Sequence, residues 1–438
     1  MIPAGESDEA LATERKWRLA DSLAARVAAA RRLDWRVHRG GEAGVVLLLT
    51  ATQWLNWGST YYLLTVLAAP ITADTGWPRA WLIAGLSGGL VLAGLLSPAM
   101  GRAIERHGGR TVLAVGSAML GLGLIGLAVA DSLISYYAAW AVLGIGMAAS
   151  LNEAAFATLG RLYGLRARGL IGGLMLMIGF VMTLWWPLCL VLVELLGWRG
   201  ACYVYAALHL LVGLPLHFFL LPREMTPPIA VRAASPSLIA GARTRQSWAI
   251  WVLGANLTLQ IAIGSVVAVH LVTLLQGRGI DVDLAVKLGS LIWLAQGSGR
   301  LLQAVVGRHT HPVWEGVAAS ACVFLGLLLL LAGDAAVVAG ALLIFGLGNG
   351  VRGIVKGTLP LVLFGAEGYA TLVGRLALPT LVAQAAGPYL GALTLDRWGV
   401  TPTLIAVAAL AFLNLALAYA LRAAVPAPTL RAETALGE

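Results

Sequence analysis

Ionisable side chains are scarce inside the long apolar stretches of this 438-residue sequence, and the few that lie there could carry chemistry. Glu153 follows Asn152 in one apolar stretch, and Arg300 lies in another, four residues after Gln296. In apolar surroundings an ionisable group is costly unless it faces water or a partner. A carboxyl there can take up and release a proton because desolvation favours its neutral form, and a guanidinium can hold a carboxylate through two hydrogen bonds. We therefore expect Glu153 to carry a coupled proton and Arg300 to bind an anionic substrate.

Further basic residues lie in apolar sequence toward the C-terminus. Arg352 follows Asn349, Lys356 comes one helical turn after Arg352, and Arg375 lies in the next stretch. We expect Arg352 and Asn349 to contact the substrate, whereas Lys356 and Arg375 fit long side chains that extend to the membrane interface. Two alternatives stay open. Arg352 can extend to the same interface, and Glu153 can form a structural ion pair with a neighbouring arginine.

Polar and aromatic side chains are concentrated at residues 53–62, in the middle of the first apolar stretch. Tryptophan and tyrosine at helix ends are typical of the membrane interface, which does not explain aromatic rings in mid-stretch. Residues three or four positions apart share a helix face, so this segment can present a polar and aromatic wall to a cavity. Amides and a tryptophan of later stretches can complete that wall. The expected lining residues are Asn56, Trp57, Thr60, Tyr61, Asn152, Asn256, Gln260, Trp293 and Gln296.

Composition places these stretches in a membrane. The chain is 59% hydrophobic and 12% charged, whereas a soluble domain carries about 25% charged residues. Stretches of roughly 20 apolar residues, the length that crosses a bilayer, recur along the chain. They are too long and unbroken for barrel strands, and open sheets cannot satisfy their backbone in lipid. The sequence therefore predicts an all-α membrane protein with twelve transmembrane helices. The expected spans are 44–70, 81–100, 111–130, 134–160, 167–195, 199–221, 247–275, 284–306, 314–331, 335–357, 368–394 and 400–421.

A polar, proline-containing segment at 222–246 divides the expected spans six and six. The fourth span of each half also carries a similar glycine pattern, Gly144-Ile145-Gly146 in one and Gly346-Leu347-Gly348 in the other. Such internal repeats are common in transporter folds, whose binding site lies between the repeats. We therefore expect a basic N-terminal segment (1–43), two pseudo-symmetric six-helix halves (44–221 and 247–421), a linker (222–246) and a C-terminal tail (422–438).

The formal charge of +9 comes from basic residues that lie mostly between the apolar stretches. This distribution argues against a nucleic-acid partner, for which the charge would gather on one soluble face. It fits the excess of basic residues that membrane proteins carry on their cytoplasmic loops, and it predicts that both termini are cytoplasmic. The basic residues after even-numbered spans, which set this orientation, are Arg102, Arg106, Arg110, Arg161, Arg166, Arg168, Arg223, Arg232, Arg243, Arg245 and Arg308.

Several kinds of site are not expected. The three cysteines lie in apolar sequence without metal-ligand spacing, and no phosphate-binding loop or nucleophile–base set is recognisable. We expect no cofactor, no metal and no enzymatic activity. Nearly all basic residues are arginine, and alanine, glycine and leucine abound. This composition favours a GC-rich bacterial genome and hence the bacterial inner membrane.

The strongest motif lies between the second and third spans and reads Gly101-Arg102-Ala103-Ile104-Glu105-Arg106-His107-Gly108-Gly109-Arg110. It resembles the loop motif of the major facilitator superfamily, with Glu105 in place of the usual aspartate and the last arginine displaced by one position. Gly197-Trp198-Arg199-Gly200, at the start of the sixth span, is also common there. The resemblance covers about residues 44–421. It implies a secondary transporter in which Glu105, Arg106 and Arg110 form a gate that can open and close.

Within that superfamily, Gln296-Gly297-Ser298-Gly299-Arg300 resembles the Asp-x-x-x-Arg pattern of monocarboxylate transporters, with glutamine in place of aspartate. Arg166-Ala167-Arg168-Gly169 is similar to the same group. Drug–proton antiporters usually have an arginine where Trp140 stands, which weighs against drug efflux.

The expected function is secondary active transport of a small, monocarboxylate-like organic anion by alternating access, coupled to protons, in a monomer embedded in the lipid bilayer. One alternative is an exporter of an amphiphilic or metal-chelating small molecule. Another, of a different class, is a non-transporting membrane receptor or an intramembrane enzyme.

Overall fold

The computed structural model describes residues 41–179, 181–222, 236–307, 309–332 and 335–425, and the side chains of 181–184, 236–246 and 335–336 are not among them. The chain divides into two compact units, residues 1–48 and residues 49–438. In the first unit, the described residues 41–48 are helical. Most of the expected N-terminal segment, linker and C-terminal tail lies outside the described residues.

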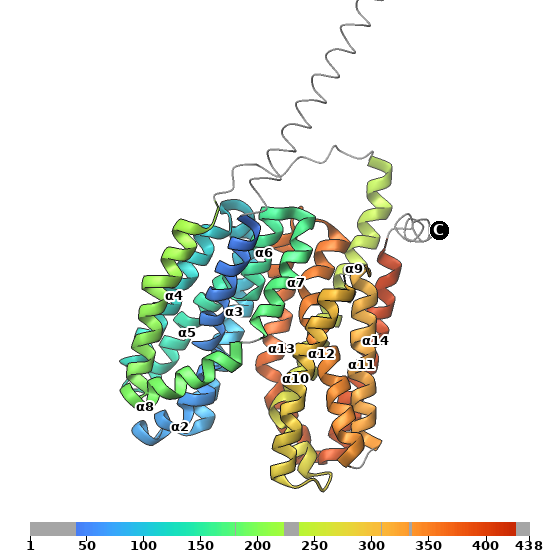
Figure 1. The fold of residues 1–438 in the computed structure, drawn as a ribbon. Coiled ribbons are helices and arrows are strands. Elements are labelled where there is room, and N and C mark those ends of the chain that lie inside the picture. Colours follow the sequence, from blue (N-terminus) through green and yellow to red (C-terminus); the bar gives the residue numbers. More distant parts are fainter. Residues whose placement is uncertain (1–40, 180, 223–235, 308, 333–334, 426–438) are drawn as a thin grey trace, which may run out of the picture. The chain divides into compact units, whose positions relative to one another are not determined.

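The second unit contains only helices and short connections in its described part (Figure 1). It begins with a helix at residues 49–58, followed by a turn at 59–62. The helices before the linker are α2 (Leu63–Thr75), α3 (Arg79–His107), α4 (Gly109–Ala128), α5 (Leu133–Ser150), α6 (Asn152–Tyr163), η1 (Gly164–Arg166), α7 (Ala167–Ile178), α8 (Val181–Leu208), η2 (His209–Gly213) and η3 (Leu216–Leu220). The helices that follow, the first of which begins within the expected linker, are α9 (Pro236–Gln276), α10 (Val282–Val306), α11 (Pro312–Ala332), α12 (Ala335–Phe364), α13 (Tyr369–Trp398), α14 (Val400–Ala420) and η4 (Leu421–Ala424).

Nine helical stretches of the described residues are long and apolar enough to cross a membrane. One of them, Leu133–Ile178, has 46 residues, which at 1.5 Å per residue is about twice the thickness of the hydrocarbon layer. It is interrupted where Leu151 is extended and where Gly164 adopts a positive φ of 58°. Trp185–Leu220 is likewise interrupted at Gly197, where φ is 70°. The helical architecture predicted from the sequence is therefore observed in the described residues.

Small residues let the helices before the linker approach one another closely. A Cβ atom at Gly85 would lie 2.6 Å from the rings of Trp140 and Tyr136. Trp140 is 1% exposed, and the hydroxyl of Tyr136 donates a hydrogen bond to the carbonyl of Leu82 at 2.8 Å. Trp140, which stands where drug–proton antiporters carry an arginine, is therefore part of the packed core of α3 and α5.

Buried histidines tie the π-helical turns η2 and η3 to neighbouring helices. His209 lies 2.7 Å from the hydroxyl of Ser59, and His217 lies 2.9 Å from that of Ser117 and 3.1 Å from that of Thr52. Both imidazoles are fully buried. Because an unpaired polar group in an apolar interior is costly, these bonds hold the end of this helical stretch against α4 and helix 49–58.

Helix α3 packs along α13 and so joins the helices on either side of the linker. The contact is closest at Gly101, where an added Cβ atom would lie 2.4 Å from the carbonyl oxygen of Ala370 and 3.1 Å from the Cα of Gly374. Both obstacles are backbone atoms, which cannot rotate away. Glycine at 101 is thus required by the separation of the two helices.

We predict that Gly101→Ala destabilises the folded protein by roughly 1–3 kcal/mol, because the added methyl group must push α3 and α13 apart. The melting temperature of the purified protein in detergent measures this. Gly88→Ala is the matched control in the same helix, since no atom of a neighbouring element lies within 4 Å of its added Cβ. Equal melting temperatures for the two variants would contradict the close contact.

Candidate functional site

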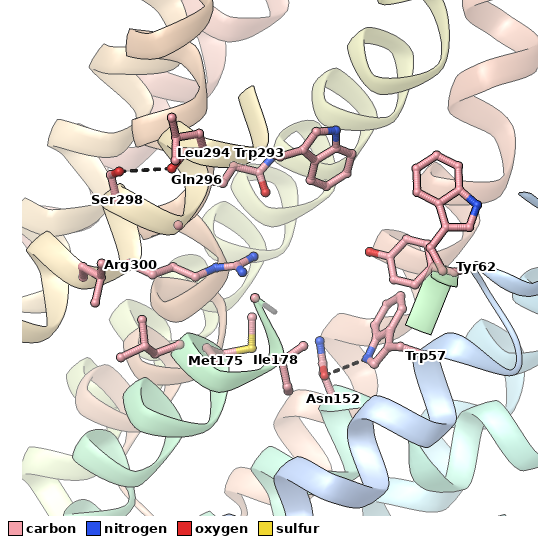
Figure 2. A pocket seen from close by; sticks show the side chains of 15 residues that line it. Trp57, Tyr62, Asn152, Met175, Ile178, Trp293, Leu294, Gln296, Ser298 and Arg300 are labelled. Atoms are coloured by element: carbon pink, nitrogen blue, oxygen red, sulfur yellow. Dashed lines mark hydrogen bonds between the residues drawn. The ribbon is translucent and has the colours of Figure 1, made fainter. Parts of the chain in front are cut away.

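A cavity of about 630 Å³ lies between helix 49–58 with its following turn, α6, α7, α8 and α10 (Figure 2). Its walls therefore come from both sides of the linker. The side chains that give it chemical character are Trp57, Tyr62, Asn152, Trp186, Trp293 and Arg300.

Arg300 is the charged member of the cavity lining. Its guanidinium projects from α10 toward the centre of the cavity, with Tyr62 on the opposite side (Figure 2). Its buried Nε has no hydrogen-bond partner among the described residues. Because a buried N–H group needs an acceptor, this geometry leaves Arg300 able to bind a carboxylate or another anion.

Gly179, just after α7, leaves the space that the guanidinium of Arg300 occupies. A Cβ atom at position 179 would lie 2.3 Å from Nη1 of Arg300. Gly179 itself has ordinary right-handed helical angles, so its small size rather than its backbone freedom is what the site uses. The sequence offered no signal for this role, because the contact depends on how α7 and α10 pack.

Aromatic rings form much of the remaining wall. The Nε1 atom of Trp57 donates a hydrogen bond to Oδ1 of Asn152 at 3.0 Å, which fixes the orientation of the indole. The rings of Trp57 and Tyr62 are 6.1 Å apart. Trp186 and Trp293 are about half exposed, at 49% and 51%. Rings of this kind can stack on an apolar or aromatic ligand while Arg300 holds its charge.

The structure brings together part of the predicted cavity lining. The predicted residues that line the cavity are Trp57, Asn152, Trp293, Gln296 and Arg300. Tyr62, Met175 and Trp186 also line it and were not predicted. Of these, Tyr62 belonged to the polar and aromatic segment that the sequence singled out, and Trp186 was a further aromatic ring within a span.

Asn56 does not line this cavity, and instead helps to close a break in the helical backbone. Leu151 is extended between α5 and α6, so the last carbonyls of α5 lack helical partners. The side-chain amides of Asn56 and Gln53 both donate to the carbonyl of Ser150, at 2.8 and 2.7 Å. Thr60 donates back to the carbonyl of Asn56. These polar groups therefore bind helix 49–58 to the α5–α6 break.

Three other predicted amides of the later helices, Asn256, Gln260 and Asn349, lie outside the cavity lining. Asn256 and Asn414 each donate to the other's backbone carbonyl, at 2.9 and 2.6 Å, and so tie α9 to α14. Gln260 is buried one turn further along α9. The side-chain amide of Asn349 is close to Gly264. Tyr61 packs edge-on against Trp57, with ring centroids 5.5 Å apart.

Glu153 forms an ion pair with Lys356 across the two sets of helices, α6 and α12. Both side chains are largely buried, and Glu153 lies in the first turn of α6, where a negative charge is favourable. The hydroxyl of Tyr369 donates to the carbonyl of Gly357 beside the pair, at 2.6 Å. We expected Lys356 to extend to the interface, and the structure corrects this, because its ammonium is held by Glu153. Glu153 and Arg300 do not contact each other.

Arg352, one turn before Lys356, is 1% exposed, and its three guanidinium nitrogens have no hydrogen-bond partner within the described residues. It is not part of the cavity lining. Arg375 is exposed, as expected for a side chain that reaches the interface.

A second charged cluster joins α7 to the start of α11. Arg168 lies 3.0 Å from Glu315, which also accepts hydrogen bonds from Gln303 and Thr310 at 2.9 Å each. The sequence singled out the segment containing Arg168 but not its partner Glu315. This cluster and the Glu153–Lys356 pair both connect helices before the linker with helices after it. We call the end of the helix bundle at which Arg168 and Glu315 lie the Arg168 end.

The expected gate residues divide between two contacts. Glu105 pairs with Arg161, whose Nη1 is 3.7 Å from the carboxylate and also donates to the backbone carbonyl of Glu105. Arg106 and Arg110 line a separate, smaller pocket. The described residues contain no group of three or more His, Cys, Asp or Glu that could hold a metal ion.

We predict that Lys356→Met lowers the free energy of unfolding by about 3–5 kcal/mol, because Glu153 would remain as a buried charge without a partner. The double variant Glu153→Gln/Lys356→Met should recover most of that loss, since neither side chain is then charged. Thermal unfolding of the purified variants in one detergent measures both effects. A double variant no more stable than Lys356→Met would refute the pairing.

The apolar helices and the ligand-sized cavity between them define a multi-pass membrane protein with an internal cavity. Its sequence matches the family model described as Major Facilitator Superfamily over residues 49–355. The chain belongs to this superfamily, which the loop motif at residues 101–110 had indicated. A comparison with curated protein sequences found no match.

Three solved structures with similar folds are those of transporters. One is the proton:xylose symporter XylE bound to 6-bromo-6-deoxy-D-glucose, with a TM-score of 0.66, 12% identity, and coverage of 87% of this chain and 95% of that one. The human organic anion transporter MFSD10 (TETRAN) gives a TM-score of 0.67 at 18% identity, covering 86% and 99%. FucP in the outward conformation gives 0.68 at 12% identity, covering 86% and 98%. At these identities the likeness shows the shared fold alone.

Proposed function

We propose that this protein is a proton-coupled secondary transporter of an organic anion that works by alternating access in a bacterial inner membrane. The observation that carries the proposal is the cavity in which the guanidinium of Arg300 lies among aromatic rings and within reach of a ligand. One cation in an otherwise uncharged wall selects for negative charge, because binding supplies an acceptor to its Nε atom, which has none among the described residues. The human organic anion transporter among the structural neighbours agrees with this choice.

The size and lining of the cavity favour an anion with an apolar or aromatic body. A volume of about 630 Å³ is in the range of drug-sized ligand pockets and is far larger than a three-carbon acid requires. Trp57, Trp186 and Trp293 offer ring faces that a small aliphatic carboxylate would leave uncovered. We therefore propose a carboxylate attached to a ring or a bulky apolar group, rather than the smallest monocarboxylates.

The proposed architecture has twelve membrane crossings in two six-helix halves, 44–221 and 247–421, joined by the linker. In this scheme the stretches Leu133–Ile178 and Trp185–Leu220 together supply three crossings, 134–160, 167–195 and 199–221. The segment 44–70 and helix α10, which are not among the nine stretches, supply the first and the eighth crossing. Arg102, Arg106, Arg161 and Arg166 lie in the loops or helix ends near the Arg168 end, which makes that end cytoplasmic by the positive-inside rule. Both termini are then cytoplasmic.

The proposed transport cycle alternates between two contacts of the halves. Glu153–Lys356, Arg168–Glu315 and the α3–α13 contact hold the halves together at the cytoplasmic end. This arrangement agrees with the similarity to FucP in its outward conformation. A proton that binds Glu153 removes the negative charge and breaks the ion pair with Lys356. The ammonium must then reach water, and opening of the cytoplasmic end allows it to do so. The Glu105–Arg161 pair, with Arg106 and Arg110 beside it, opens in the same step.

The second candidate function is export of an amphiphilic compound. The aromatic walls and the volume of the cavity favour it, whereas the positive charge of Arg300 in the cavity wall disfavours a neutral or cationic cargo. The two functions differ in whether a carboxylate on the substrate is required. A matched pair of an aromatic carboxylate and its amide, compared for binding to one purified protein, separates them.

We predict that Arg300→Gln weakens binding of an aromatic carboxylate by about tenfold to a hundredfold, the value of a charge-assisted hydrogen bond, and removes the preference for the carboxylate over its amide. Tryptophan fluorescence titration measures both, because indole rings line the cavity.

Gly179→Ala should weaken binding of the aromatic carboxylate as well, since its methyl group displaces the guanidinium of Arg300. Gly173→Ala, in α7, is its control, with no atom of a neighbouring element within 4 Å of the added Cβ. Equal affinities of the two alanine variants would contradict the role of Gly179.

We predict that Glu153→Gln abolishes accumulation driven by a pH gradient in proteoliposomes, because the amide cannot take up a proton. Exchange of labelled substrate without a gradient should persist, since it requires no net proton movement. Lys356→Met tests whether loss of the ion pair alone has the same effect, because it keeps the Glu153 carboxyl. If Glu153→Gln transported with unchanged pH dependence, the coupling assignment would be wrong, and binding at Arg300 would be unaffected.

A further inference from the structure

A second, strongly basic pocket of about 360 Å³ lies at the Arg168 end, outside the substrate cavity. Arg106, Arg110 and Arg161 line it together with His107. The neighbouring carboxylate, Glu105, is already engaged by Arg161. Arg106 and His107 are exposed, and no hydrogen bond or ion pair joins either side chain to another described residue. The pocket therefore has an excess of positive charge for which an anion is the natural occupant.

Backbone N–H groups add to the positive electrostatic potential of this pocket. Gly108 and Thr111 form part of the wall, so the N-terminus of α4 borders the pocket. No side chain of the described residues caps this helix end. Its first N–H groups are therefore free to donate to an oxyanion, and the helix dipole favours negative charge there. Three guanidiniums and an uncapped helix end around one small space match the tetrahedral oxygens of a phosphate.

The remaining wall shows which kind of phosphate this pocket fits. Phe218 lines the pocket, and the guanidinium of Arg110 lies over its ring, 5.1 Å from the centroid. Phe218 is 45% exposed, and the adjacent Phe219 and Leu220 are 69% and 63% exposed. Large apolar side chains exposed at the end of a membrane helix face lipid chains. The pocket thus has a cationic interior and an apolar rim on the lipid side.

We propose that this pocket binds the phosphate of an anionic phospholipid, with the headgroup among Arg106, Arg110 and Arg161 and the acyl chains along Phe218 and Phe219. A free phosphate compound would satisfy the same cations but would gain nothing from the apolar rim. Because the pocket is built on the ends of α3, α4 and α6, an occupied site links these three helices through one shared anion. The proposal does not depend on the identity of the transported substrate.

Native mass spectrometry of the purified full chain, titrated with phosphatidylglycerol or phosphatidylcholine, tests the proposal. Phosphatidylglycerol should be retained preferentially. Arg110→Gln should weaken its binding by about tenfold, the value of one charge-assisted contact. Arg102→Gln is the matched control, because it removes one exposed arginine from the same end without touching the pocket. Equal retention of phosphatidylglycerol by these two variants, or no preference over phosphatidylcholine, would overturn the site.

Two further measurements separate a lipid from a soluble phosphate. An excess of inorganic phosphate should fail to displace phosphatidylglycerol, and Phe218→Ala should weaken lipid binding. Displacement by inorganic phosphate, together with normal lipid retention by Phe218→Ala, would assign the pocket to a soluble anion and refute the lipid. If Arg110→Gln does not fold, the exposed Arg106→Gln variant gives the same comparison with Arg102→Gln.

Discussion

A bilayer interior has no water with which to solvate polar groups, so a buried polar group is costly unless it finds a partner within the protein or reaches a water-filled space. The Ser150 carbonyl at the break between α5 and α6 shows the first solution, since the amides of Gln53 and Asn56 bind it. The Glu153–Lys356 ion pair is the same solution for two charged side chains, because each is the other's partner. Arg300 shows the second solution, because its guanidinium reaches a cavity instead of a protein partner. Polar groups with a protein partner hold the fold together, and the one that reaches the cavity carries the proposed function.

The same constraint explains why part of the site could be predicted from the sequence. In a chain this apolar, a polar or charged residue inside a span is conspicuous, and Trp57, Asn152, Trp293, Gln296 and Arg300 were all found in this way and do line the cavity. The membrane fold was predictable for the same reason, since uncharged apolar runs of bilayer length are typical of membrane-spanning helices. The loop motif around Glu105 identified the superfamily because it joins a tight glycine turn to a fixed charge pattern.

The other residues show what a sequence cannot specify. Asn56 and Asn256 are as conspicuous as Asn152, yet they bind backbone carbonyls. Whether an amide faces a cavity or a carbonyl depends on helix breaks and helix rotation, which a pattern of residue types does not encode. Lys356 lies 203 residues from its partner Glu153, and only the packing of α6 against α12 brings the two together. Gly179 acts by leaving the space that the guanidinium of Arg300 occupies.

The break at Leu151 has a mechanical consequence. It makes α6 a separate short helix that begins at Asn152, and its first two residues face different structures. Asn152 contacts the indole that forms the cavity wall, and Glu153 holds the lysine of α12. A tilt or rotation of α6 by a few degrees would therefore displace the ligand wall and the ion pair at once. In the proposed cycle, the cavity wall and the ion pair with Lys356 are therefore linked through the single peptide bond between Asn152 and Glu153.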